Sequence, residues 1–341
     1  MAAGALYFLG LGGAPAESTN LPPKPQDLTG MSLEDLLHVE IIPVNVLGSH
    51  THLKHEIMVG YRYMYMEMDD NFEGSRVVSP NEVLNSYPVA HTRMTMTMNM
   101  VELMYAPSDS LTLMAMIPYD VKTMDHIYAS GLPPTHDVVS GLGDLSFMGL
   151  VNLLGDPCAN GNRLILNAGF TAPTGSINEG ENGKRYEYEM QLGSGTFDLL
   201  PGLSYLGESE TFAWGAQVLG TVRLGYNAND YRLGNAYRLS AWTQMKVTDW
   251  FGPSVRLDWH AWQNIYGADP TLNPARNPAF DATKQSGERL DFMAGLNFYL
   301  GKGPLKGNRF SIEGGVPLYQ YLAGPNMGVN WMITAAWTYT F

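Results

Sequence analysis

Charged residues are scarce in this chain. Asp, Glu, Lys and Arg make up 16% of its 341 residues, against roughly 25% in ordinary soluble domains. No run of the chain is rich in Lys and Arg, and the net charge is −13, which argues against nucleic acid or an anionic lipid surface as a partner. The single cysteine, Cys158, cannot form an internal disulfide or a cysteine-based zinc site.

Long apolar runs are missing as well. No charge-free apolar stretch reaches about 18 residues, whereas a transmembrane helix needs about 20, so the sequence excludes helical membrane spans. The chain is instead rich in glycine (37 residues), methionine (20 residues) and aromatic side chains (11%). Low charge, many aromatics and no long apolar run are typical of a chain that meets lipid with every second side chain.

The sequence predicts three regions. Residues 1–16 are apolar, rich in small residues and end in Ala-Pro-Ala, so we treat them as the remnant of a signal peptide. Residues 17–54 are predicted to form an N-terminal periplasmic or plug-like segment. Within it, a hydroxyl N-cap and a stripe of leucines predict a short helix near residues 32–38. Residues 55–341 are predicted to form an outer-membrane β-barrel.

Apolar and polar residues alternate with period two from about residue 55 onward. In residues 56–65, for example, Ile57 and Tyr61 occupy odd positions, whereas Glu56 and Arg62 occupy even ones. The same separation recurs to the end of the chain, and each segment is long enough to cross a bilayer, which takes about 9–11 tilted residues. It predicts about 12 strands, near residues 55–68, 93–105, 111–123, 143–154, 162–173, 194–206, 211–226, 236–249, 253–265, 288–300, 308–321 and 327–341.

The predicted connections alternate between short turns and long polar loops, the longest near residues 69–92, 124–142, 174–193 and 266–287. Short periplasmic turns, long extracellular loops and an even strand count are typical of outer-membrane barrels. A soluble β-sandwich, the alternative, would have shorter strands and no such alternation. We therefore predict an all-β fold: a transmembrane antiparallel β-barrel of about 12 strands with a short N-terminal periplasmic helical segment, located in the outer membrane of a Gram-negative bacterium.

The C-terminal residues 337–341 are aromatic at every second position and end in Phe341. This pattern resembles the terminal strand by which outer-membrane barrels are recognised for assembly. It predicts the barrel-assembly machinery as a partner, besides the lipid of the outer membrane.

Methionine is concentrated at even positions in the first three predicted strands. Glu102 shares that face, whereas Val101 and Leu103 lie on the other, and a carboxylate facing lipid would cost a few kcal/mol. The even face is therefore predicted to line the lumen. Thioether sulfur is neutral and soft, so it binds Cu(I) or Ag(I) in preference to hard cations. The alternative, that methionine is a flexible filler or makes an apolar path, stays open.

Histidines add candidate ligands at both ends of these strands. His50 and His52 precede the first strand, and Met124 and His126 lie at the outer end of the third. Each could also be an ordinary polar loop residue. The full predicted metal-ligand set is Met64, Met66, Met68, Met94, Met96, Met98, Met100, Met114, Met116, Met124, His126, His50 and His52.

The remaining inward positions carry charges of both signs. They predict a narrow lumen that is salt-bridged where methionine is absent, through Arg62, Arg163, Arg223, Arg238, Lys246, Arg256 and Arg289 against Glu56, Glu102, Asp120, Asp144, Asp198, Asp258, Asp291 and Glu313.

Several segments resemble a known family, namely residues 61–68, 94–100, 104–109, 113–119, 124–126, 140–144 and 192–198. They resemble the methionine-rich outer-membrane transporter proteins, which are akin to the barrel family named for the meta-pathway of phenol degradation. The resemblance spans residues 50–341. It implies an outer-membrane channel, with the broader family associated with hydrophobic or aromatic compounds and the methionine-rich members with copper.

Two functions follow from these observations. The first is an outer-membrane channel or binding barrel that passes or sequesters a soft metal ion, Cu(I) or Ag(I), through a methionine-lined lumen. The alternative is a passive channel for hydrophobic or aromatic small molecules. No cofactor is predicted to be required, Cu(I) being the one candidate. An enzyme is not expected, because no inward Ser/His pair with an orienting acid and no Gly-x-Ser-x-Gly motif is present. A further alternative is a purely structural protein that packs within an envelope complex.

Overall fold

The structure, a computed structural model, describes residues 45–155 and 161–341. The signal-peptide remnant predicted for residues 1–16 and the helix predicted near residues 32–38 lie outside the described residues, as does most of the predicted 17–54 segment. In the described part of the chain, no helix is both long and apolar enough to cross a bilayer.

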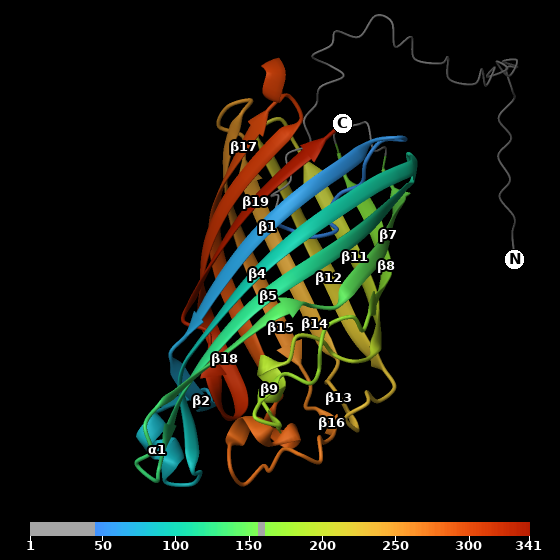
Figure 1. The fold of residues 1–341 in the computed structure, drawn as a ribbon. Coiled ribbons are helices and arrows are strands. Elements are labelled where there is room, and N and C mark those ends of the chain that lie inside the picture. Colours follow the sequence, from blue (N-terminus) through green and yellow to red (C-terminus); the bar gives the residue numbers. More distant parts are fainter. Residues whose placement is uncertain (1–44, 156–160) are drawn as a thin grey trace, which may run out of the picture. The chain divides into compact units, whose positions relative to one another are not determined.

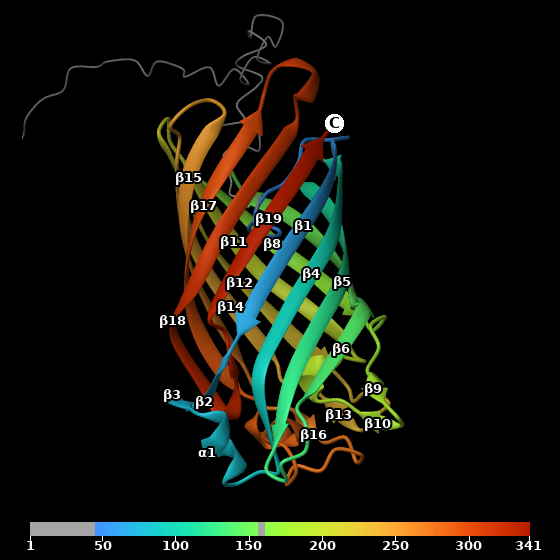
Figure 2. The ribbon, with the colours of Figure 1, turned by 60° about the vertical axis from the view of Figure 1, so that its left-hand side comes forward.

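Twelve strands of the described chain close into one antiparallel barrel (Figure 1). Each strand pairs with its neighbour along the chain, and Figure 2 shows β19 lying between β1 and β18, which closes the cylinder. Closure leaves no unpaired sheet edge around the barrel, a requirement for a sheet that spans a bilayer. The strands are β1 (Ile57–Met68), β4 (Val89–Ser108), β5 (Leu111–Tyr128), β7 (Leu145–Leu154), β8 (Arg163–Ala172), β11 (Phe197–Glu208), β12 (Phe212–Leu224), β14 (Ala236–Met245), β15 (Phe251–Trp262), β17 (Gly287–Leu300), β18 (Asn308–Gly328) and β19 (Trp331–Thr340).

The predicted fold class and strand number are confirmed, and the differences lie at strand ends. β4 and β18 extend beyond the predicted residues 93–105 and 308–321. In addition, β6 (Thr135–Leu142), which the sequence analysis assigned to a loop, pairs with the outer half of β5. Its first residues are Thr, His and Asp, a composition typical of a loop, so no period-two signal reveals the strand.

Two kinds of connection define the two ends of the barrel. The turns at residues 109–110, 209–211 and 246–250 join strands at one end, whereas long connections at residues 69–88, 173–196, 225–235 and 263–286 lie at the other. We refer to these as the short-turn end and the long-loop end. In outer-membrane barrels the short turns are periplasmic and the long loops extracellular.

Small elements occupy the long connections and one turn. They are β2 (Asp70–Gly74), β3 (Arg76–Val78), α1 (Pro80–Leu84), β9 (Gly180–Glu181), β10 (Lys184–Arg185), η3 (Tyr188–Met190), β13 (Tyr231–Arg232), β16 (Tyr266–Gly267), η4 (Pro278–Phe280), η5 (Ala282–Lys284) and, at the short-turn end, η6 (Gly303–Leu305). The α1 helix begins after Ser79, whose hydroxyl accepts a hydrogen bond from the Glu82 backbone N–H and so caps the first turn.

The predicted alternation of side chains is confirmed in the methionine-rich strands. In β4, Glu102 is 5% exposed and Met104 is 1% exposed, whereas Leu103 between them is 43% exposed. Successive side chains of a strand point to opposite faces, so the even positions of β1, β4 and β5 line the lumen. The outer face carries exposed aliphatic and aromatic side chains on every barrel strand, as a lipid-facing surface requires.

The two ends of the barrel sequence meet at the short-turn end. The backbone of Phe341 exchanges hydrogen bonds with Ile57, with N···O distances of 2.9 and 3.0 Å. The Phe341 side chain is exposed. Its recognition by the barrel-assembly machinery stays a prediction.

Candidate functional site

The lumen of the barrel is occupied at the short-turn end by residues 45–52, which precede β1. Luminal side chains hold this segment through its backbone carbonyls. The Arg62 guanidinium, the Asn167 amide and the Gln217 amide donate to the carbonyl oxygens of residues 45, 48 and 47 at 2.7, 2.6 and 2.9 Å. Gly48 has a φ of 63°, and a Cβ there would lie 2.9 Å from the Asn167 amide nitrogen, so the close approach requires glycine.

The methionines at even positions of β1, β4 and β5 line one side of the lumen, and we call this surface the methionine wall. Its part at the short-turn end packs against the inserted segment. Val46 is 4% exposed and belongs to one buried cluster that also contains Met58, Met100, Met104, Met114, Met116 and Met148. Methionine is unbranched and flexible, so it fills the irregular space between a barrel wall and a non-regular segment. Three predicted metal ligands, Met100, Met114 and Met116, therefore have a packing role at the short-turn end.

The other half of the methionine wall packs against a long loop that folds inward. The loop, residues 173–196, contributes Met190 and Leu192 to a second buried cluster. Its strand members include Met68, Met94, Met124, Met293, Met327 and Met332, with Met66 and Met96 packed against them. Asp144 fixes the loop to the wall, because its carboxylate accepts hydrogen bonds from the Gly175 N–H at 2.9 Å and the Ser194 N–H at 2.8 Å.

The predicted histidine ligands lie at opposite ends of the barrel. The rings of His50 and His52 are 5.1 Å apart at the short-turn end, and His52 Nδ1 lies 3.3 Å from a Glu56 carboxylate oxygen. His126 lies near the far end of β5, beside the long loops. The predicted ligand set is therefore divided between the two ends of the barrel, with Met98 packed against the first methionine cluster and Met64 directly opposite it on β1.

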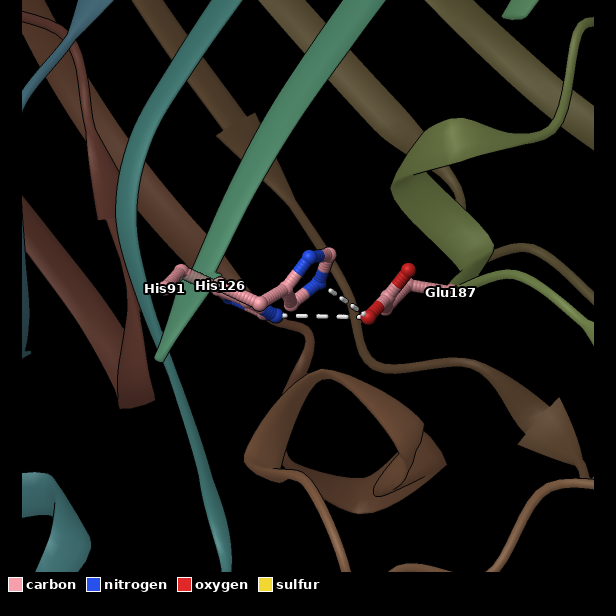
Figure 3. A group of neighbouring side chains, drawn as sticks. All are labelled: His91, His126 and Glu187. Atoms are coloured by element: carbon pink, nitrogen blue, oxygen red, sulfur yellow. Dashed lines mark hydrogen bonds and ion pairs between the residues drawn. The ribbon is translucent and has the colours of Figure 1, made fainter. Parts of the chain in front are cut away.

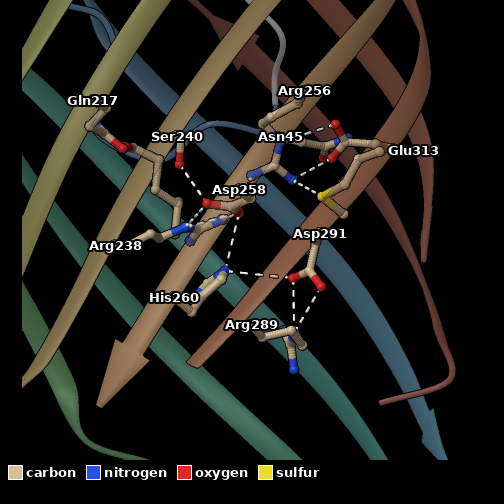
Figure 4. Close-up of polar contacts among 12 residues, drawn as sticks. Asn45, Gln217, Arg238, Ser240, Arg256, Asp258, His260, Arg289, Asp291 and Glu313 are labelled. Carbon is tan, nitrogen blue, oxygen red and sulfur yellow. Dashed lines mark hydrogen bonds and ion pairs between the residues drawn. The ribbon is translucent and has the colours of Figure 1, made fainter. Parts of the chain in front are cut away.

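The luminal wall opposite the methionines is salt-bridged, as predicted. Arg256 lies between Asp258 and Glu313, with N···O distances of 2.8 and 2.6 Å (Figure 4). Arg238 also pairs with Asp258, and Arg289 pairs with Asp291 at 2.8 Å. Buried charges are tolerated only when they are paired and hydrogen-bonded, so this network makes the lumen polar and filled on that side.

Ser240 and His260 lie in the same network but contact the same carboxylate rather than each other. The Ser240 hydroxyl donates to Asp258 at 2.7 Å, and His260 Nε2 lies 3.3 Å from the other oxygen of that carboxylate. A hydrolytic triad needs the histidine to accept the serine proton directly. This arrangement is therefore structural, and the expectation that the chain is not an enzyme stays a prediction.

A cavity of about 450 Å³ lies inside the barrel between its wall and the long loops. Its lining includes the apolar residues Met98, Pro118, Leu192, Leu233, Trp262 and Ile265 and the charged residues Asp120, Lys122, Asp144, Glu189 and Arg223, together with the uncharged polar residues Gln191, Ser194, Gln263 and Gln285. Burial raises the pKa of Glu189. Most of the other charged side chains of the lining are hydrogen-bonded or ion-paired to groups of the protein itself. The Lys122 ammonium donates to the carbonyl oxygens of residues 189 and 191 at 2.9 and 2.6 Å.

At the long-loop end, His91 of β4 and His126 of β5 converge on Glu187 of the inward loop (Figure 3). The Nε2 atoms of His91 and His126 lie 3.4 and 2.9 Å from the same carboxylate oxygen, Oε1. Burial raises the pKa of Glu187, but hydrogen bonds from His126 and His91 outweigh it and hold that pKa well below its ordinary value.

The sequence analysis found His126 but missed His91 and Glu187. His91 faces His126 directly in the β4–β5 register, a pairing that a strand beginning at residue 93 cannot reveal. Glu187 is 96 residues from His91 in the chain, and nothing local to the sequence indicates that its loop folds inward.

Comparison with solved structures supports the same architecture. The COG4313 outer membrane channel from Pseudomonas putida F1 matches with a TM-score of 0.63 at 15% identity, over 89% of this chain and 100% of that one. The fold of this chain is that of a Gram-negative outer-membrane β-barrel. The barrel also matches the β domain of the Bordetella autotransporter BrkA (TM-score 0.43, 14% identity, 84% of this chain and 100% of that one) and the Pseudomonas putida toluene transporter TodX (0.40, 10%, 85% and 90%).

No protein-family model matches the barrel, and no curated protein does. Its resemblance to the methionine-rich transporter family therefore stays a prediction. The fold shared with the COG4313 protein is what the comparisons establish.

The salt-bridge network predicts a large cost for removing its central carboxylate. Asp258→Asn leaves the buried guanidinium of Arg256 with one carboxylate partner, Glu313, and removes the carboxylate partner of the half-buried Arg238. We expect the free energy of unfolding to fall by about 3–5 kcal/mol, the range for breaking a buried ion pair. Urea denaturation of the folded barrel in lipid vesicles measures it. Asp249→Asn, in an exposed turn, is the matched control and should stay within about 0.5 kcal/mol of the parent; equal effects of the two changes would contradict the network's role.

Proposed function

We propose that this barrel is a passive outer-membrane channel for hydrophobic or aromatic small molecules. The observation that carries the proposal is the cavity of about 450 Å³ within the barrel. Sites for small organic ligands span roughly 300–1,000 Å³ and are lined mainly by apolar side chains with a few polar groups. A single metal ion needs no such volume.

The chemistry of the cavity lining favours an uncharged solute. Lys122 and Asp144 are each bound to backbone groups of the inward loop, and Arg223 is paired with Asp198. These charges are satisfied by the protein, so they offer little to a charged solute. The apolar part of the lining, including Leu233 and Trp262, offers contact surface to an uncharged solute, and Asp120, Glu189 and uncharged polar side chains lie beside it.

Filling the cavity tests this proposal. Leu233 lies in the long connection between β12 and β14 and is half-buried against the cavity. Leu233→Trp adds a bulky ring there, so we expect uptake of toluene into proteoliposomes to fall at least threefold. Leu132→Trp, at an exposed position in another loop, should leave uptake unchanged. Heat-modifiable gel migration confirms that each variant is folded, and a folded Leu233→Trp barrel with undiminished uptake would contradict the proposal.

A soft-metal channel or binding barrel is the second candidate, favoured by the register of the methionine wall. Met64, Met66 and Met68 of β1 lie directly opposite Met98, Met96 and Met94 of β4. Met66 also faces Met332 of β19 on its other side. Directly opposed residues have Cβ atoms about 4.5–5.5 Å apart, so thioethers adjoin along the wall, and thioethers bind Cu(I) and Ag(I).

Replacing one strand of this ladder separates the two candidates. A variant with Met94, Met96, Met98 and Met100 all changed to Ile keeps an apolar wall but loses four sulfur atoms. If the wall carries soft metal, the purified variant binds less Ag(I) or Cu(I) than the parent, measured by elemental analysis after dialysis. If it serves only packing and an apolar path, toluene uptake persists and metal content does not change. Equal metal content in both proteins would contradict the soft-metal candidate.

A further inference from the structure

We propose that His91, His126 and Glu187 form a binding site for a divalent transition-metal ion of the zinc class. The site is separate from the methionine wall and lies at the long-loop end of the barrel (Figure 3). It differs from the soft-metal set predicted from the sequence in its ligands, because it uses imidazole nitrogen and carboxylate oxygen instead of thioether sulfur.

The spacing of the three side chains fits one metal ion. One ligand atom from each of them lies within 4.8 Å of the others. The His126 Nε2 to Glu187 Oε1 distance is 2.9 Å, and the His91 Nε2 to Glu187 Oε1 distance is 3.4 Å. A tetrahedral zinc ion with bonds of about 2.0–2.2 Å holds its ligand atoms about 3.3 Å apart. Small side-chain rotations therefore suffice to convert the cluster into a coordination shell.

Burial and an unused lone pair point to a missing partner. His91, His126 and Glu187 are 1%, 3% and 3% exposed. Within the described part of the chain, the second carboxylate oxygen of Glu187, Oε2, is buried and accepts no hydrogen bond. A buried carboxylate oxygen without a partner is costly, and a missing ion is one of the standard explanations.

Two neighbouring side chains, Asp137 and Asn277, contact the histidines of the proposed site. The Asp137 carboxylate lies 3.4 Å from His126 Nδ1, on the far side of the ring from the site. The contact is not a hydrogen bond, and Nδ1 is buried without a hydrogen-bond partner among the described residues, but a carboxylate commonly lies in this position beside a metal-binding histidine. Nε2 of the same ring faces Glu187, and a bound ion would displace the proton that it donates to that carboxylate.

The Asn277 side chain contacts both His91 and Glu187. The Asn277 side-chain oxygen accepts from the Ala279 backbone N–H at 3.0 Å, which fixes which end of the amide faces the site. Its Nδ2 group lies 3.0 Å from His91 Nε2 and donates to Glu187 at 2.7 Å. The amide therefore holds His91 Nε2 and Glu187 Oε1 beside each other.

A metal ion at this site would connect the barrel wall to the inward loop. His91 and His126 belong to adjacent strands, whereas Glu187 directly precedes η3, whose residues 188 and 189 line the cavity. A second cavity of about 230 Å³ is lined by His126, Asp137 and Glu187 on one side and by exposed residues 181 and 182 on the other. It gives an ion a route from the long-loop end. The bound ion would hold the inward loop in place over the cavity.

Zinc titration of the intact protein tests the site. The full chain, stripped with chelator in detergent, is titrated with ZnCl₂ by calorimetry. We expect one Zn²⁺ per chain, and an affinity at least tenfold lower in His91→Gln and in Glu187→Gln. His136→Gln, an exposed histidine paired with Asp125 on the same side of the barrel, is the matched control and should bind as the parent does. Mg²⁺ and Ca²⁺ should not compete, because they prefer oxygen ligands.

Two further measurements keep the test decisive. Heat-modifiable gel migration reports whether each variant is folded, and zinc X-ray absorption on the parent protein identifies the ligands without any substitution. Nitrogen and oxygen neighbours with no sulfur are expected, and Met124→Leu should leave affinity unchanged. Absence of Zn²⁺ binding by the parent, affinity unaltered in folded His91→Gln and Glu187→Gln, or a sulfur neighbour would each overturn the proposal.

Discussion

Closure of the barrel is the constraint on which the rest of this structure depends. Because side chains alternate along each strand, half of them enter an enclosed space in which polar groups lose contact with water. The structure meets this requirement in two ways. Arg256 is neutralised between Asp258 and Glu313, whereas Arg62 donates to the backbone of the inserted residues 45–52. Both solutions fill the lumen, so the space left for a solute is the cavity beside the long loops.

The methionine wall serves two inserted segments of different shape. Val46 packs against it at the short-turn end, and Met190 and Leu192 pack against it at the long-loop end. An unbranched, flexible side chain suits both contacts better than a branched one would. Thioether sulfur remains available to a soft ion on the same wall, so packing and metal binding are compatible there. The cavity, whose lining includes Met98 and Leu192, has the volume of a site for a small organic molecule.

The sequence was informative wherever a physical rule acts locally, and uninformative wherever the fold joins distant segments. The position of Glu102 between Val101 and Leu103 was enough to predict which face of β4 lines the lumen, because period two is a property of the strand itself. It could not reveal that residues 45–52 enter the barrel, since their contacts with Asn167 and Gln217 come from strands more than 100 residues away. The role of Glu187 could not be predicted for the same reason. Its loop is held inward by Asp144, and neither residue lies in a sequence pattern that indicates the contact.

The central claim is that the lumen holds a site for an uncharged small molecule and that the methionines around it serve mainly for packing. Anomalous X-ray scattering from crystals of the full chain, grown separately with bromobenzene and with Ag(I), tests this most directly. The account predicts a bromine peak in the cavity near Met98, Leu233 and Trp262. A cavity without bromine, together with silver ordered among Met94, Met96, Met98 and Met100, would contradict it.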